Sequence, residues 1–244
     1  KRRSSRKPVP TAVTRTPHSP RMRTGSTHLL RILHLASPAL PIGAFHFSQG
    51  LEYAVEAGWV KDESTAFEWI AGVARHALGT LDLPVLFRMH RAASLGDEDG
   101  LRRWGRFLLA ARETEELRAE DRHMGSALAR ILRELGATIP GQQRTQSGYA
   151  EMFAVACVHW NIPEHEALQA FAWTWAENQI LAAVKLVPLG QSAGQRMLHA
   201  LVPILEEIAA QAVHIDDEDI GACAVMQGLA SARHETQYTR LFKS

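Results

Sequence analysis

Cysteine is scarce in this chain. Only Cys157 and Cys223 occur among the 244 residues, and neither belongs to a paired metal-ligand spacing. The N-terminal region also has no apolar segment of the kind found in secretory signal peptides. Small secreted folds that depend on disulfides need several cysteines, so this class is excluded. We expect a reduced, cytoplasmic compartment in which both thiols are unpaired.

Long apolar runs are missing as well. The most hydrophobic segment is interrupted by Glu177 and Lys185, so no run reaches the length of about 18 residues that suggests a transmembrane helix. We therefore expect no membrane span. Alternating strand patterns are also absent, whereas apolar residues at helical spacing recur throughout, and 46% of the residues are hydrophobic. These features predict an all-α fold, a single globular domain of roughly eight to ten helices.

Signatures of catalysis and of metal binding are absent too. The glycine-containing segment 190–194 lacks the Gly-Lys-Ser/Thr of a P-loop, and no G-x-S-x-G or Cys/His signature is present. None of the 12 histidines forms H-E-x-x-H, H-x-x-E-H or H-x-H. His214, beside the acidic run at 216–219, is the one local His/carboxylate cluster and leaves weak nickel or zinc affinity open. The sequence predicts a protein that is not an enzyme, with no catalytic residue, metal site or stoichiometric cofactor.

Acidic residues are absent from the first 27 positions, which hold eight of the 27 Lys and Arg residues. The remainder then has 19 basic and 26 acidic residues, a net charge of −7. Because residues 1–27 are also rich in Pro, Ser and Thr and poor in large apolar side chains, we expect a disordered basic tail followed by a helical domain at 28–244. A nucleic-acid arm or an organelle presequence is conceivable, but an upstream extension, with Met22 as a start, is the favoured interpretation.

The most informative stretch that is present runs from Asn161 to Gln195. We expect Asn161 to cap a helix whose first turn contains Pro163, with Glu164 completing a capping box. Apolar residues follow on two faces of this helix, which predicts that it is central in the fold. Pro188 should end it, and a loop carrying Gly190 and Gly194 should lead into the next helix.

Two polar residues of this helix lie on one line. Asn178 and Lys185 are seven residues apart, and are therefore roughly 20° apart around the helix axis. Lys185 either complements the negative C-terminal end of its helix or faces a partner together with Asn178. The sequence alone leaves both interpretations open.

Further helices are predicted on both sides of this stretch. Ser48 and Asp62 should cap two of them, Asp82 and Pro84 should begin another, and the long helical stretch 99–135 should break near Gly125. The charged sequence RETEELRAED at 112–121 is expected to form a solvated salt-bridge face rather than an acid/base site. Other helices are expected at 28–36, 149–160, 195–212 (kinked at Pro203) and after Asp216–Asp219.

The end of the chain has an unusual composition. Arg233, Arg240 and Lys243 are mixed with Tyr238, Leu241 and Phe242. Aromatic residues and arginine are typical of binding hot spots, whereas chain ends are normally polar and mobile. If these side chains were exposed they would form an apolar patch rimmed by charge, so we expect the segment to dock onto another protein.

Four blocks of sequence together resemble the UreF family of urease accessory proteins. They are SPALPIGAF with SQGLEYAVEAGWV at 37–60, RETEELRAED at 112–121, NQILAAVKLVPLGQSAGQR at 178–196 and RHETQYTRLF at 233–242. The resemblance implies an all-helical, non-enzymatic protein that forms a homodimer and binds a second accessory protein, UreD (also called UreH). That pair would recruit the GTPase UreG and apo-urease for GTP-dependent insertion of nickel, with carbon dioxide, at the active-site lysine. Nickel and GTP would be handled by the partners, and no nucleic acid or membrane is expected.

The resemblance also implies which residues bind partners. They are Pro41, Phe45, Asn178, Lys185, Gln191, Arg233, His234, Glu235, Tyr238, Arg240 and Ser244. The chain departs from the family pattern at Ala44, His46 and Lys243, and His46 adds a candidate metal contact. Two alternatives remain, a helical interaction scaffold unrelated to urease and a helical protein that binds metal through ligands from distant segments.

Overall fold

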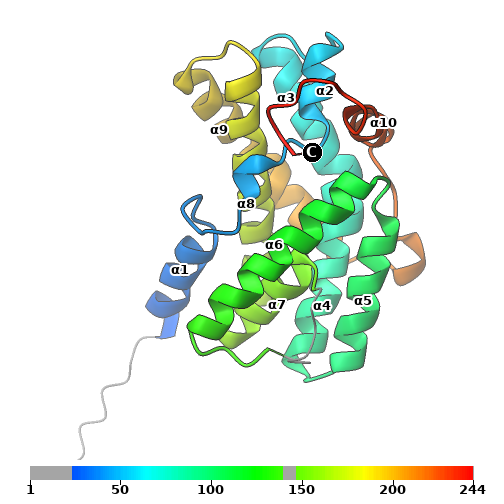
Figure 1. Cartoon of the computed structure of the whole chain (residues 1–244). Coiled ribbons are helices and arrows are strands. Elements are labelled where there is room, and N and C mark those ends of the chain that lie inside the picture. Colours follow the sequence, from blue (N-terminus) through cyan, green and yellow to red (C-terminus); the bar gives the residue numbers. More distant parts are fainter. Residues whose placement is uncertain (1–23, 140–146, 244) are drawn as a thin grey trace, which may run out of the picture.

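A computed structural model describes residues 24–139 and 147–243. Within these ranges the chain is helical, without β-strands, and forms one globular body (Figure 1), which confirms the predicted all-α class. The α-helices of the described residues are α1 (Thr24–Leu35), α2 (Leu51–Glu56), α3 (Glu63–Val73), α4 (Leu83–Ser94), α5 (Glu98–Ala111), α6 (Glu115–Glu134), α7 (Tyr149–His159), α8 (Glu164–Leu186), α9 (Gln191–Ala212) and α10 (Val225–His234). Two short 3-10 turns, η1 (Ala44–His46) and η3 (Asp217–Asp219), and a π-helical segment, η2 (Ala74–Asp82), complete them.

Helix α8 is central, as its apolar circumference predicts. It packs against α9, α4, α2, η1 and α1, and Figure 1 shows it running through the middle of the body. The predicted cap is wrong, however. Pro163 is the residue that precedes α8, while Asn161 adopts a left-handed φ of 54° in the turn that ends α7. The amide of Ile162 donates to the Cys157 carbonyl there, so this turn belongs to the end of α7.

The predicted helix start at Asp82 is also wrong. Asp82 has right-handed helical dihedrals, and α3, η2 and α4 form one continuous helix from Glu63 to Ser94. By length and composition alone this helix could cross a membrane, but 72% of its most apolar window is buried inside the protein. A core helix has the same composition, so the finding gives little support to a span. The Asp62 cap at its start is confirmed, with Thr65 completing a capping box.

The stretch 99–135 breaks at a different place from the one expected. Helix α5 ends at Ala111, and α6 begins at Glu115 with Thr114 as its cap. Gly125, where the break was predicted, lies inside α6 and is buried. A glycine is needed there because a Cβ atom would collide with the carbonyl oxygen of Ser147 from the segment before α7. The glycine therefore permits a close crossing of two segments and does not end a helix.

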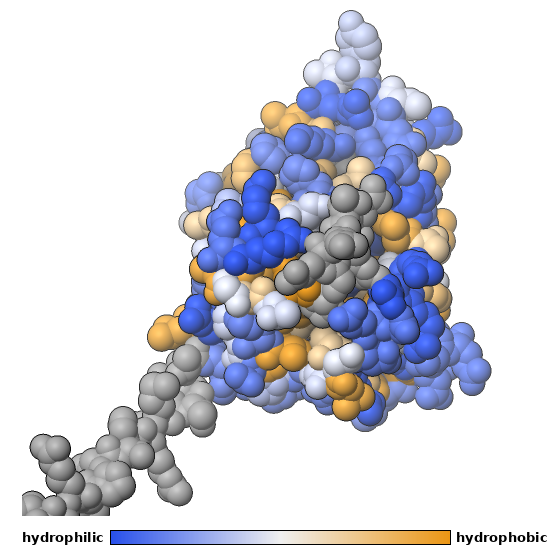
Figure 2. Space-filling view, turned by 60° about the horizontal axis from the view of Figure 1, so that its bottom comes forward, coloured by the Kyte–Doolittle hydropathy of each residue, from blue (hydrophilic) through white to orange (hydrophobic). Residues whose placement is uncertain are grey.

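The remaining boundaries differ little from the predicted ones. Helix α1 begins at Thr24, so residues 24–27 of the predicted tail are helical, and residues 1–23 lie outside the described part. Gly194 lies in the first turn of α9 instead of a loop, and Pro203 lies inside α9. Figure 2 shows one face of the body, on which hydrophilic residues predominate and apolar ones form small groups.

Candidate partner-binding surface

The site begins where α2 and α10 meet. Gly50, which precedes α2, has a φ of 83°, and a Cβ atom on it would lie 2.8 Å from the amide nitrogen of Ser231. Only a residue without a side chain allows α10 to approach this closely. The predicted Ser48 cap is wrong, since Gly50 is the residue that caps α2. Ser48 is buried and accepts the Glu52 amide at 3.3 Å. This packing places the Glu52 carboxylate beneath the end of the chain.

The residues after α10, 235–243, fold back onto the body, and we call them the C-terminal segment. The Glu52 carboxylate accepts the amides of Leu241 at 2.6 Å and Phe242 at 2.9 Å. The amide of Lys243 donates to the His46 carbonyl of η1 at 2.8 Å. Phe242 is buried, whereas Leu241 is 69% exposed and Tyr238 is fully exposed. The expectation of an exposed apolar end is thus confirmed for Leu241 and Tyr238 and wrong for Phe242.

The same segment completes the start of α6. The Glu235 carboxylate accepts the amides of Glu115 at 2.9 Å and Glu116 at 3.3 Å, which helix geometry leaves without intrahelical partners. Thr114 accepts the Leu117 amide, and its hydroxyl lies 2.8 Å from that of Ser231. The α6 terminus and the chain end therefore stabilise each other.

His234, the last residue of α10, is fully buried between two carboxylates. Its Nε2 lies 3.0 Å from Oε2 of Glu52, and its Nδ1 lies 2.8 Å from Oε2 of Glu116. Arg240 donates to the other oxygen of Glu116 at 2.8 Å. Three residues predicted to meet a partner, namely His234, Glu235 and Arg240, therefore direct their polar groups at their own chain. They build the surface, and sequence reasoning missed the two glutamates that anchor it.

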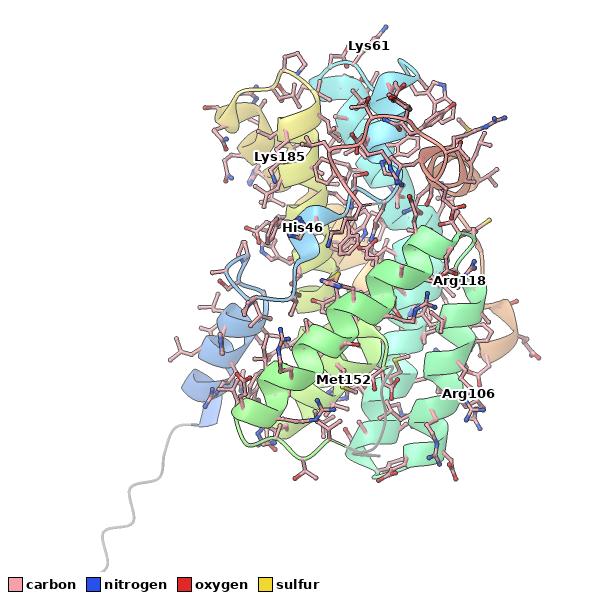
Figure 3. All side chains as sticks on the ribbon, in the orientation of Figure 1. His46, Lys61, Arg106, Arg118, Met152 and Lys185 are labelled. Atoms are coloured by element: carbon pink, nitrogen blue, oxygen red, sulfur yellow. The ribbon has the colours of Figure 1, made fainter. Side chains whose placement is uncertain are left out.

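Lys185 joins this surface from α8. Its ammonium lies 5.6 Å from the centre of the Phe242 ring and 5.8 Å from that of Phe45, within the range of cation–π attraction. Figure 3 shows Lys185 and His46 on the face that Figure 1 marks with the C-terminus. Desolvation, followed by the charges of Lys243, His123 and Lys185, lowers the pKa of His46 below its ordinary value. Three distant blocks, η1, the end of α8 and the C-terminal segment, form one composite surface.

Other predicted residues lie elsewhere on the body. Pro41 is exposed in the turn before η1, Gln191 is exposed at the start of α9, and Arg233 is exposed on α10. Asn178 shares a line with Lys185 but is half-buried and lines an internal cavity, whereas Lys185 is exposed. Ser244 lies outside the described residues.

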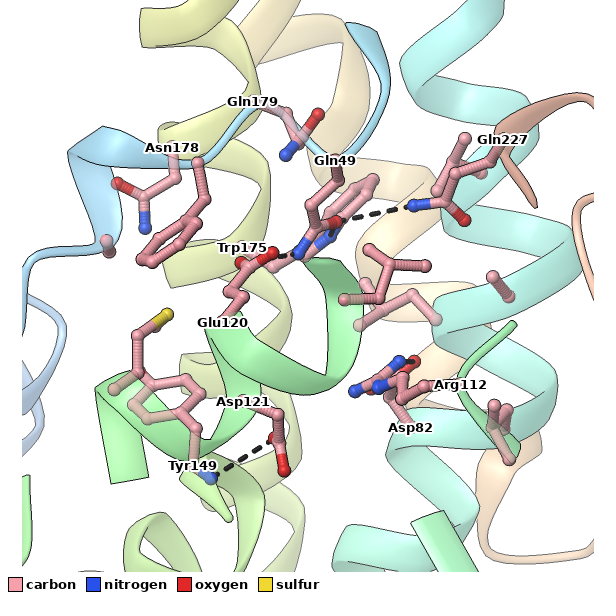
Figure 4. A pocket seen from close by; sticks show the side chains of 18 of the residues that line it. Gln49, Asp82, Arg112, Glu120, Asp121, Tyr149, Trp175, Asn178, Gln179 and Gln227 are labelled. Carbon is pink, nitrogen blue, oxygen red and sulfur yellow. Dashed lines mark hydrogen bonds and ion pairs between the residues drawn. The ribbon is translucent and has the colours of Figure 1, made fainter. Parts of the chain in front are cut away.

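That cavity, shown in Figure 4, has a volume of about 60 Å³ and is lined by both apolar and polar side chains. Gln49 donates to Glu120 at 2.8 Å and accepts the indole N–H of Trp175 at 2.9 Å. Arg112 donates to both oxygens of Asp82, at 2.5 and 3.2 Å. Polar groups withdrawn from water need such partners, and these side chains provide them for one another.

The charged sequence at 112–121 is therefore only partly a solvated face. Glu115 pairs with Arg118 and Arg122 at the surface, and hydrogen bonds from these arginines lower the pKa of Glu115. Arg112 and Asp121 instead face the cavity. Helical spacing of charges cannot show which side of an amphipathic helix other segments cover, and this is why the prediction is confirmed at Glu115, Arg118 and Arg122 but wrong at Arg112 and Asp121.

Asp121 and Tyr149 form the floor of the cavity. The Asp121 carboxylate accepts the Tyr149 amide at 3.1 Å, and burial raises the pKa of Asp121 despite the nearby positive charge of Arg112. Burial also raises the pKa of Tyr149, whose hydroxyl has no hydrogen-bond partner among the described residues. Across these residues, no group of three or more His, Cys, Asp or Glu side chains is arranged to hold a metal ion.

Comparisons with known proteins agree on one family. A family model described as UreF matches residues 60–202. The urease accessory protein UreF of Alkalilimnicola ehrlichii is 46% identical over 216 residues, covering 88% of this chain and 95% of that protein. UreF of Hahella chejuensis is 45% identical (88% and 98% covered), and UreF of Teredinibacter turnerae is 44% identical (90% and 100% covered).

Proposed function

Because the chain belongs to the UreF family of urease accessory proteins, we propose that it bridges UreD (UreH), the GTPase UreG and apo-urease during urease maturation. In this role it catalyses no reaction itself. Membership in the family replaces the alternative of a scaffold unrelated to urease. The four blocks that resemble the family lie largely on or beside the composite surface, and this supports a role in binding.

One observation carries the proposal, namely that exposed apolar side chains project from a C-terminal segment that is hydrogen-bonded to the body. Tyr238 and Leu241 project outward, while Glu52 accepts the backbone amides of Leu241 and Phe242 and Glu116 accepts the Arg240 side chain. A segment whose shape is already fixed loses less conformational entropy on binding, so its exposed anchors contribute more to affinity. We assign this segment to UreD and the neighbouring Lys185 to the contact with UreG.

The handling of nickel and GTP belongs to the partners in this proposal. The family resemblance supports this division, in which UreG binds and hydrolyses GTP and the assembled complex delivers nickel and carbon dioxide to apo-urease. We also propose a cytoplasmic homodimer that binds neither nucleic acid nor membrane. Trp173 of α8 is a large aromatic side chain at the surface and is a candidate for the dimer contact. Light scattering of the wild-type protein and of Trp173→Glu tests this assignment, and equal masses would contradict it.

Reconstitution tests the bridging role directly. The protein is mixed with purified UreD, UreG, apo-urease, nickel, bicarbonate and GTP, and urease activity is measured. We expect activation that requires this protein and GTP, together with a complex that UreD pulls down. Leu95→Ala is the control for changes at Tyr238 and Leu241, because it removes an exposed apolar side chain far from the C-terminal segment in sequence, just after α4, and it should activate urease like the wild type. Activation without the protein, or failure to bind UreD at any concentration tested, would contradict the proposal.

A further inference from the structure

The cluster around His234 contains more hydrogen-bond acceptors than a neutral histidine can satisfy. A neutral imidazole has one N–H donor and one lone pair, whereas an imidazolium has two donors. Each ring nitrogen of His234 lies close to a carboxylate oxygen. Nε2 is 3.0 Å from an oxygen of Glu52, and Nδ1 is 2.8 Å from an oxygen of Glu116. With both glutamates ionised, only the imidazolium donates to each of them.

The other donors around the cluster are already engaged. Glu52 accepts two backbone amides of the C-terminal segment, and Glu116 accepts Arg240. The charged groups facing His234 are therefore Glu52 of α2, Glu116 of α6 and, across Glu116, Arg240 of the C-terminal segment. With His234 protonated these four charges sum to zero, and without that proton a net negative charge remains.

Burial makes this difference costly. The His234 side chain is fully buried, and those of Glu52 and Glu116 are 9% and 12% exposed. An unpaired carboxylate in such surroundings is strongly unfavourable, because water cannot replace the missing donor. A neutral histidine between two ionised carboxylates is therefore one proton short, and the cluster needs that extra proton whichever of its groups carries it.

We propose that Glu52, His234 and Glu116 form a protonation-dependent latch that positions the C-terminal segment for partner binding, a role that rests on the proposed function. When the proton is present, the segment is held on the body with Tyr238 and Leu241 presented outward. When the proton is lost, the repulsion between the His234 lone pair and a carboxylate favours undocking. The carboxylates contact the Leu241 and Phe242 amides directly, so undocking begins at those residues. Glu52 and Glu116 are positioning residues in this account.

Amide hydrogen exchange of the isolated protein tests the latch without any partner. The readout is protection of residues 235–243, corrected for the intrinsic exchange rate at pH 6 and pH 8. Loss of one proton can change the docking equilibrium of the segment by at most about tenfold per pH unit, and the two values are two units apart. We therefore expect protection of the wild-type segment to fall by roughly tenfold or more between them. The amides of α8 serve as an internal reference and should change little.

Glu116→Gln is the informative variant. Its amide oxygen can still accept Arg240, and its NH₂ group can donate to the lone pair of a neutral His234, whose other nitrogen then donates to Glu52. We expect its segment to stay docked at both pH values, with protection constant to within about twofold. Glu134→Gln, an exposed glutamate at the end of the same helix, should keep the wild-type pH profile. His234→Gln removes the imidazole and should also give a flat profile, and it replaces Glu116→Gln as the test variant where that variant does not fold.

The outcomes separate the latch from the proposed function. A flat wild-type profile, or a Glu116→Gln profile as steep as that of the wild type, would overturn the latch. Affinity for UreD is then measured at both pH values. Weaker wild-type binding at pH 8 with unchanged Glu116→Gln binding supports positioning, whereas pH-independent wild-type affinity overturns it. Absence of UreD binding at both pH values, with the exchange profile intact, would contradict the proposed function alone.

Discussion

The Lys185 ammonium lies 5.6 Å from the centre of the Phe242 ring, so the last turn of α8 contacts the end of the chain. Lys185 therefore does more than complement the C-terminal end of its helix. It lies between Phe242 and Phe45 and joins the C-terminal segment to η1, while its charge remains exposed to a partner. This relationship gives the first prediction.

Lys185→Ala should fold normally but weaken the coupling to UreG. An exposed cation–π contact contributes about 0.5 to 1 kcal/mol, too little to unfold the domain but enough to loosen the C-terminal segment. We expect an almost unchanged melting temperature and a lower yield of GTP-dependent urease activation, with Lys185→Arg close to wild type. If Lys185→Ala activates urease with wild-type yield and GTP dependence, the lysine has no role in coupling.

Tyr238→Ala and Phe242→Ala should have different effects, because one side chain is exposed and the other is buried. Tyr238→Ala should leave segment protection unchanged and reduce affinity for UreD by about 2 kcal/mol or more, as loss of an interface anchor does. Phe242→Ala should reduce protection of the segment by roughly tenfold or more, about 1.4 kcal/mol. Hydrogen exchange and calorimetry with UreD measure the two effects, and identical results for both variants would argue against this division of roles.

Asp82→Ala should be strongly destabilising. Burial lowers the pKa of Arg112, but the charges of Asp82 and Asp121 and the hydrogen bond to Asp82 outweigh it and leave this pKa raised. Removing Asp82 leaves a buried guanidinium without its bidentate partner, which costs about 3 to 5 kcal/mol. Urea denaturation measures the free energy of unfolding, and Glu115→Ala at the exposed ion pairs should lower it much less. Equal losses would show that the two sites are equivalent.

Gly125→Ala and Gly72→Ala should change stability in opposite directions. A Cβ atom at Gly125 collides with backbone atoms of Ser147 and Gly148, so overpacking should cost about 1 to 3 kcal/mol or more. A Cβ atom at Gly72 in α3 meets no atom within 4 Å, and alanine there should stabilise the helix by up to about 1 kcal/mol. Melting temperatures of the two variants check the sign, and a stabilised Gly125→Ala would show that α6 and the 147–148 segment are farther apart.

Asp121→Asn should increase the free energy of unfolding, and the increase should be largest at neutral pH. Burial raises the pKa of Asp121 in the folded protein, so its favourable contribution is complete below the ordinary value of about 3.9 and is lost as the pH rises through the raised value. Asparagine keeps an acceptor for the Tyr149 amide without the charge. We expect the gain in unfolding free energy to be larger at pH 7.5 than at pH 3, which lies below the ordinary pKa of an aspartate. A gain that grows as the pH falls would show that folding lowers the pKa of Asp121 and does not raise it.

Local rules predicted much of the fold from the sequence. The Asp62 cap, the break after Val187 and the central position of α8 follow from side-chain chemistry that acts within a few residues. The errors at Asp82 and Gly125 have one cause. A residue that often ends or begins a helix is placed in each case by contacts with distant segments, an ion pair to Arg112 and a close crossing at Ser147.

The surface was predicted in its parts but not in its construction. Phe45 was identified through family resemblance, whereas Lys185 and the residues after Arg233 were also identified from helical spacing and composition. The structure brings Phe45 and Lys185 together with Phe242. Glu52 and Glu116 were missed because each is one of several acidic residues in amphipathic helices. Only tertiary packing shows that these two are covered, and no spacing in the sequence distinguishes them.

The central claim is that the docked C-terminal segment is the surface that UreD binds, and one affinity measurement tests it. The variant lacks residues 236–244 and keeps His234, which is fully buried, and Glu235, which caps α6. Calorimetric titration with UreD compares it with the full chain, after circular dichroism has shown that both are helical. The account predicts a folded protein with a lowered melting temperature and no measurable binding. Unchanged affinity in this variant would contradict it.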